Sequence, residues 1–133
     1  MSLLPINRPV NPAQDLGATV FEDVDLSLVQ VYLAAAQRGP GAIDGRTFRG
    51  CRIQGPAVML VGGDTTFEDT NFGDSRGDMA NMILRPAGSK VIGAIPVRGC
   101  TFIGCEFFGI GFTGAPEFLD ELMKLPSGPG ARS

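Results

Sequence analysis

The segment 90-KVIGAIPVRGCTFIGCEFFGIGFTG-114 divides into five blocks of five residues each. The third residue of every block is apolar, and the last residue is Gly in four of the five blocks. The apolar third residues are Ile92, Val97, Phe102, Phe107 and Phe112. An α-helix repeats near 3.6 residues and a simple strand repeats every two, so a period of five indicates neither element alone.

The same spacing occurs in three earlier segments, 19–28, 46–60 and 65–74. Their third residues are Phe21, Leu26, Phe48, Ile53, Val58, Phe67 and Phe72. The segment 47-TFRGCRIQG-55 also matches 101-TFIGCEFFG-109 at its Thr, Phe, Cys and both Gly positions. Self-similarity of this kind is typical of a repeat architecture.

Each block predicts one short extended piece followed by a corner. The third residue points into the core, and so does the residue two before it, because side chains alternate along a strand. Small or β-branched residues occupy this second inward position, and they include Cys51, Cys100, Cys105, Thr65 and Thr70. The final Gly or Asp suits a corner where φ is positive.

The blocks CTFIG, CEFFG, TTFED and TNFGD resemble those of the pentapeptide-repeat proteins, over roughly half the chain. That resemblance implies a right-handed parallel β-helix. We therefore expect an all-β fold, a single-stranded parallel β-helix, right-handed, with short capping α-helices. The coil is expected to be irregular and short, because Phe48 to Phe67 spans 19 residues and Phe67 to Phe102 spans 35, whereas Ile92 to Phe112 spans 20.

The whole chain is expected to form a single domain over residues 1–133, with its core at about 17–114. Ser27 and Pro116 are suitable first residues for two helices. The expected parts are a helix at about 27–38, a loop at 75–89 with one irregular strand near Met82–Leu84, a C-terminal capping helix at about 116–125, and poorly ordered tails at 1–15 and 126–133.

Composition excludes several classes of function. The net charge of −3 is too small to indicate a strongly basic or acidic partner, and we expect no direct binding to nucleic acid. The sequence has no His, which removes the commonest general base and the commonest metal ligand. No signal peptide is recognisable, and the longest apolar run, 57-AVMLV-61, is too short for a membrane span. We expect a cytoplasmic protein that is not bound to a membrane.

The three cysteines are Cys51, Cys100 and Cys105. They could be imagined as metal ligands, but a fourth donor is missing, so we interpret them as small apolar residues that fill the core. The segment 109-GIGFTG-114 matches GxGxxG, but too few residues follow it to complete a dinucleotide-binding βαβ unit. We therefore predict no cofactor, no metal ion and no catalytic residue.

Two groups of surface residues are candidates for a binding site. The first group is acidic and would form a cation site or carboxylate pair, unless it is only a solvated face: Glu22, Asp23, Asp25, Glu68, Asp69 and Asp74. The second is apolar at positions expected to face outward: Met59, Ile103 and Phe108. Either a second copy covers these apolar residues or another part of the same chain does.

These features predict a non-enzymatic module for protein interaction or self-assembly, present as a dimer or trimer or bound to another protein. The resemblance to pentapeptide-repeat proteins supplies one alternative, an acidic DNA mimic that modulates a DNA-binding enzyme such as a topoisomerase. A second alternative is a carbohydrate-active β-helix enzyme, which would need paired carboxylates in a groove.

Overall fold

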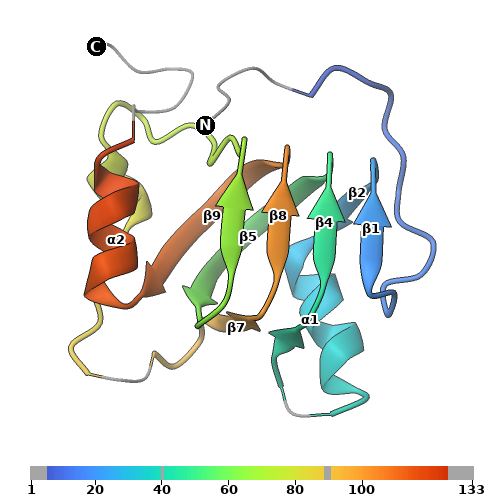
Figure 1. Ribbon diagram of the computed structural model, residues 1–133, viewed down its shortest axis with the longest axis horizontal. Helices are drawn as coiled ribbons and strands as arrows, with labels where there is room; N and C mark the ends of the chain where they lie inside the picture. Colours follow the sequence, from blue (N-terminus) through green and yellow to red (C-terminus); the bar gives the residue numbers. More distant parts are fainter. Residues whose placement is uncertain (1–5, 40, 89–90, 126–133) are drawn as a thin grey trace.

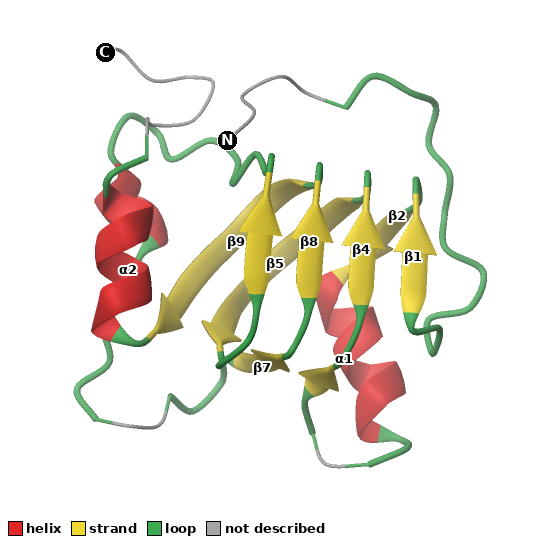
Figure 2. Cartoon of the chain, viewed as in Figure 1, coloured by secondary structure: helices red, strands yellow, loops and turns green. Residues whose placement is uncertain are grey.

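The computed structural model describes residues 6–39, 41–88 and 91–125. It contains two sheets of parallel strands, one of four strands and one of five, and two α-helices (Figures 1 and 2). The strands are β1 (Val20–Glu22), β2 (Asp25–Ser27), β3 (Ile43–Asp44), β4 (Thr47–Arg49), β5 (Arg52–Val61), β6 (Thr66–Glu68), β7 (Ile95–Arg98), β8 (Thr101–Ile103) and β9 (Glu106–Gly114). The helices are α1 (Leu28–Ala36), the 3-10 helix η1 (Met79–Met82) and α2 (Pro116–Met123).

The four-stranded sheet aligns one Phe from each of its strands. Its order is β1-β4-β8-β6, and its register pairs Phe21 with Phe48, Phe48 with Phe102, and Phe102 with Phe67. Successive ring centroids are 5.1, 4.8 and 5.0 Å apart, with interplanar angles of 5–8°. This spacing is close to the distance between neighbouring strands, so the rings stack as the backbones pair.

The five-stranded sheet has the order β2-β5-β7-β3, and β9 also pairs with β5. Its register aligns Leu26 with Ile53, Ile53 with Phe107, and Met59 with Phe112. These side chains meet the Phe column of the other sheet in one core, where Phe48, Phe102, Phe107 and Phe112 are fully buried.

The expectation of an all-β, single-stranded β-helix is wrong. Two parallel sheets and two α-helices make an α/β fold, and their strands do not follow one another as the turns of a solenoid do. In the four-stranded sheet, β8 lies between β4 and β6 although it follows both in the chain. The block pattern identifies the strands and their inward residues, but a period does not specify which strand pairs with which.

Two residues predicted to point into the core, Val58 and Ile92, do not do so. A register shift between β5 and β9 places Gly55 and Pro56 opposite the single residue Gly109. The extra residue turns Met59 into the core, where it is fully buried, and leaves Val58 only partly buried. Met59 therefore cannot belong to an outward apolar face. Ile92 is 97% exposed because it precedes β7 and belongs to no strand.

Helices cover two parts of the sheets. Helix α1 begins after Ser27, whose hydroxyl accepts a hydrogen bond from the Gln30 amide, and its Leu28, Val31 and Ala35 are buried. Helix α2 begins with Pro116, contacts β6 through the stacked rings of Phe118 and Phe67, and buries Leu119 and Leu122. Both helices lie within the ranges predicted from the sequence. The predicted irregular strand near Met82–Leu84 is a single bridge, between Ile83 and Phe112.

Residues 6–15, which the sequence predicts to be part of a poorly ordered tail, make specific contacts with the rest of the chain. Asn11 donates its amide to the Asp25 carboxylate at 2.7 Å and accepts the Asp25 amide at 2.8 Å. Ala13 and Leu16 pack against the core close to the end of the sheet that β1 forms. The predictions for residues 1–5 and 126–133 lie outside the described residues.

The predicted corners are confirmed in the four-stranded sheet. The residue two positions after each stacked Phe has a positive φ: 53° at Asp23, 61° at Gly50, 61° at Gly104 and 47° at Asp69. This left-handed conformation costs an ordinary L-residue roughly 1–2 kcal/mol, and Gly and Asp tolerate it best.

Alanine substitutions test these corners. We expect Gly104→Ala to lower the free energy of unfolding by about 1–2 kcal/mol, from the backbone alone, since nothing lies near the added Cβ. Gly50→Ala should cost more, because its Cβ would also meet the Asp23 carboxylate. Gly39→Ala is the matched control, with ordinary φ and open space, and should be close to neutral. Urea unfolding measures all three, and equal values for the three variants would contradict this account.

Candidate functional site

Strand β6 forms one end of the four-stranded sheet, so only one side of it is paired. The Thr66 amide donates to the Cys100 carbonyl and the Gly104 amide donates to the Glu68 carbonyl, so Thr66 and Glu68 face β8. In a parallel ladder the intervening residues face the other way. The backbone of Phe67 therefore points to the open side, and forms no ladder hydrogen bond with the described residues.

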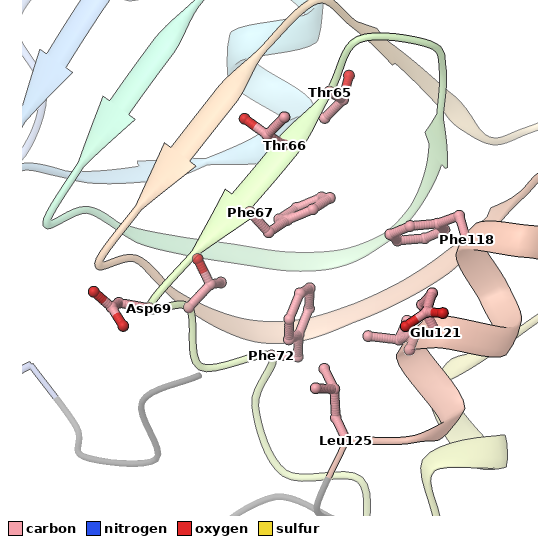
Figure 3. A pocket seen from close by; sticks show the side chains of 10 residues that line it. Thr65, Thr66, Phe67, Asp69, Phe72, Phe118, Glu121 and Leu125 are labelled. Atoms are coloured by element: carbon pink, nitrogen blue, oxygen red, sulfur yellow. The ribbon is translucent and has the colours of Figure 1, made fainter.

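Helix α2 stands across from this open side, and a groove of about 440 Å³ separates the two (Figure 3). The Phe118 ring of α2 stacks on the Phe67 ring with centroids 5.7 Å apart and an angle of 28°. Phe72 tilts against Phe67 at 5.2 Å, so three aromatic rings converge at the floor of the groove. The volume lies within the range of about 300–1,000 Å³ that binding sites for small ligands occupy.

The rim of the groove is polar and negatively charged. Thr65 and Thr66 lie at one end, Asp69 lies on the strand side, and Glu121 lies on the helix side (Figure 3). Asp69 and Glu121 give the rim a formal charge of −2, and the described lining residues include no Lys, Arg or Cys. The groove therefore offers an apolar floor and an anionic rim, but no nucleophile paired with a base.

The outward apolar candidates are not brought together at this groove. Ile103 lies on β8, between Arg49 of β4 and Glu68 of β6, and is partly buried. Phe108 lies on β9 opposite Gln54 and is 41% exposed. Phe108 is thus only partly covered by its own chain, and Met59 is in the core.

Four of the six acidic candidates form two pairs, Glu22 with Asp23 and Glu68 with Asp69. Glu22 and Asp23 follow Phe21 on β1, and Glu68 and Asp69 follow Phe67 on β6, on the same side of the sheet. Because β4 and β8 lie between them, three strand spacings separate the groups, or about 14 Å. The two similar FED segments therefore do not stack on each other. Asp74 lies apart from both, in a turn where its carboxylate accepts the Arg76 amide at 2.8 Å.

Among the acidic candidates, Asp25 alone forms ion pairs with other residues in the described part of the chain. Its carboxylate accepts hydrogen bonds from Arg52 at 2.6 and 3.0 Å and lies 3.2 Å from Nη1 of Arg8. These partners hold the pKa of Asp25 below its usual value, through the Arg52 hydrogen bonds above all. This arrangement fastens the N-terminal segment to β2 and β5.

The three thiols are free and buried, as predicted for residues that fill the core. Each sulfur lies 3.3–3.5 Å from a carbonyl of a neighbouring segment: Cys51 from Phe21, Cys105 from Phe48 and Cys100 from Ile43. The Thr70 hydroxyl makes the equivalent contact with Phe102 at 3.4 Å, so Cys and Thr serve the same packing role. Within the described ranges, no three His, Cys, Asp or Glu residues are grouped so that they could hold a metal ion.

Comparisons with known proteins found no relative of this chain. No protein-family model, no curated protein and no solved structure matches the chain. The resemblance to pentapeptide-repeat proteins therefore stays a prediction. None of the helices in the described part of the chain combines the length and the apolar character needed to cross a membrane.

The groove is not predicted by the sequence. The sequence predicts a capping helix at about 116–125, which contains Phe118 and Glu121, but it predicts no binding site there. A strand that stands at the end of its sheet presents an open side, and this position follows from the strand order alone.

The ion pairs of Asp25 predict a pH-dependent contribution to stability. The pKa of Asp25 is lower in the folded protein than in the unfolded chain. The ion pairs therefore contribute fully to the free energy of unfolding at pH values above the pKa of Asp25 in the unfolded chain. This contribution is lost as the pH falls through the pKa of Asp25 in the folded protein. Asp25→Asn should lower the free energy of unfolding by about 2 kcal/mol at pH 7, and the difference from the unmodified protein should shrink below pH 4. Asp120→Asn, which removes the exposed pair with Arg85, should cost less than about 1 kcal/mol. A deficit for Asp25→Asn that stays constant from pH 7 to pH 2 would contradict the assignment.

The buried thiols should resist modification in the folded protein. Burial raises the pKa of Cys100, and a hydrogen bond with Cys51 together with burial raises the pKa of Cys105. The thiolate is the reactive form, so we expect no rapid reaction of Cys100 or Cys105 with a disulfide reagent at pH 8. The same protein in urea should react at all three cysteines. Rapid labelling of Cys100 in the folded protein would contradict this prediction, because it would show that the reagent reaches the thiol without unfolding.

Proposed function

We propose that the protein is a non-enzymatic interaction module that binds an extended segment of another protein in the groove between β6 and α2. The observation that supports this most directly is the unpaired side of β6. An added strand can form main-chain hydrogen bonds with the Phe67 backbone, which is how sheet edges recognise extended peptides.

The side chains of the groove suggest what the bound segment contains. Phe67, Phe72 and Phe118 form an apolar floor that accommodates one large apolar side chain. Asp69 and Glu121 on the rim, with Glu68 on the adjacent strand position, favour Lys or Arg on either side of it. The proposed partner is therefore an extended segment in which a basic residue flanks an aromatic or branched apolar residue.

The test uses a fluorescein-labelled hexapeptide that alternates Lys with Val or Phe, and measures its anisotropy with the purified protein. We expect Glu121→Lys to weaken binding by at least roughly fivefold, or about 1 kcal/mol, because it reverses the charge at the rim. Glu117→Lys makes the same change on the same helix outside the groove and should leave the affinity unchanged. The same peptide with alternate amides methylated should bind more weakly, because it cannot pair as a strand.

Three results would contradict the proposal. The first is an absence of binding by the alternating peptide. The second is equal loss for Glu121→Lys and Glu117→Lys, which would mean that overall charge governs the interaction. The third is undiminished binding of the methylated peptide, which would remove the added strand as the mode of recognition.

Self-association as a dimer or trimer is a second candidate, favoured by the 41% exposure of Phe108 on β9. Light scattering after size exclusion measures the solution mass, and Phe108→Glu should then dissociate the assembly. If the protein is a monomer at high concentration, Phe108 and Ile103 do not mediate self-association.

The remaining hypotheses have less support among the described residues. An acidic DNA mimic needs one extended negative face, but the Glu22 and Glu68 groups are separated and Asp25 is ion-paired. A carbohydrate-active enzyme was expected on a β-helix, and the two parallel sheets with two α-helices do not form one. A cytoplasmic location belongs to the proposal, and the three free thiols favour a reducing compartment.

A further inference from the structure

A charged residue occupies an inward position of the fold. Arg46 lies two residues before the stacked Phe48, and the equivalent positions before Phe102 and Phe67 are Cys100 and Thr65. Arg46 is only 9% exposed. Its Nη1 donates to the carbonyls of Leu16 at 3.3 Å and Ala18 at 3.0 Å, which fixes the guanidinium group in place.

Arg46 forms no ion pair with a carboxylate in the described part of the chain. The ion pairs in residues 6–39, 41–88 and 91–125 use Arg8, Arg52, Arg85, Arg98 and Lys124, and none of them includes Arg46. Two carbonyl oxygens satisfy hydrogen bonds but supply no negative charge. A buried charge without a counter-ion is costly, so the position favours an anion.

Arg46 shares a pocket of about 190 Å³ with two further arginines, Arg38 and Arg98. The pocket lies beyond the end of α1, and Asp44 is the one carboxylate among its described lining residues. The three arginines and one aspartate among the lining residues sum to a formal charge of +2, in a chain whose net charge is −3. Asp44 is already paired with Arg98 at 3.2 Å.

The negative end of the α1 dipole accounts for an exposed Arg38 near its C-terminus, but it does not account for a buried Arg46.

We propose that Arg38, Arg46 and Arg98 bind an oxyanion of the phosphate class, either free or as a phosphate monoester. Guanidinium groups match this geometry because they donate paired hydrogen bonds to phosphate oxygens. Binding sites for drug-sized ligands have volumes of at least about 300 Å³. This pocket is smaller, so it can hold the phosphate group but not a large molecule attached to it.

The test follows the Nε–Hε signals of the arginines by NMR while inorganic phosphate is added at constant ionic strength. We expect saturable shifts at Arg38, Arg46 and Arg98, and none at Arg85. A parallel titration with O-phosphoserine separates the two sources: tighter binding of phosphoserine indicates a phosphate monoester, and equal or weaker binding indicates free phosphate.

Two matched pairs of variants make the test specific. Arg98→Gln should weaken phosphate binding roughly tenfold, because it removes charge-assisted hydrogen bonds. Arg85→Gln removes an arginine from a similarly exposed Arg–Asp pair outside the pocket and should have no effect. Asp44→Asn should tighten binding by removing the opposing carboxylate, whereas Asp120→Asn should leave it unchanged.

These variants alter exposed side chains, so the fold is expected to persist in each of them. The proposal is overturned if phosphate produces no saturable shift, or if Arg98→Gln and Arg85→Gln have equal effects. It is also overturned if Asp44→Asn weakens binding, since the carboxylate would then belong to the site rather than oppose it.

Discussion

Parallel pairing that places one Phe above another is the interaction on which the rest of the structure depends. The column of Phe21, Phe48, Phe102 and Phe67 repeats at 4.8–5.1 Å, close to the spacing that backbone hydrogen bonds impose on neighbouring strands. Ring stacking and strand pairing thus require the same geometry. The corner residues that follow each Phe maintain it, because a positive φ turns the chain at the same level in every strand.

Both ends of this column are covered. Residues 6–16 pack close to the β1 end, where the Asp25 ion pairs hold them, and α2 stands at the β6 end. The two coverings differ in quality. Phe21 is buried at one end, whereas Phe67 at the other end is only partly buried beneath Phe118. The incomplete covering of β6 produces the groove, so the candidate site results from how the aromatic column ends.

The sequence predicts local features well and the arrangement of the strands poorly. A period of five identifies Phe48, Phe102 and Phe107 as buried residues and Gly50 and Gly104 as corners, because these depend on alternation and on φ. Strand order depends on long-range pairing, and each strand contains a similar Phe, so the pattern cannot distinguish the possible neighbours. Met59 shows a further limit: one extra residue in β5 reverses which side chains face the core. Neither the groove nor the arginine pocket could be predicted, because both join segments that are distant in the chain.

The order of the strands also has a consequence for how the chain reaches its fold during synthesis. Strand β6 emerges from the ribosome after β4 but before β8, its native neighbour, and Phe67 precedes its partner Phe102 by 35 residues. Until β8 is made, the side of β4 that β8 occupies in the folded protein is free to pair with β6 instead. Strand β6 carries the same Thr-Phe pair as β8, so the two strands can align with β4 in the same register. The uniform Phe column that stabilises the final sheet would accept β6 beside β4 equally well, and β6 would then have to separate from β4 before β8 could insert between them.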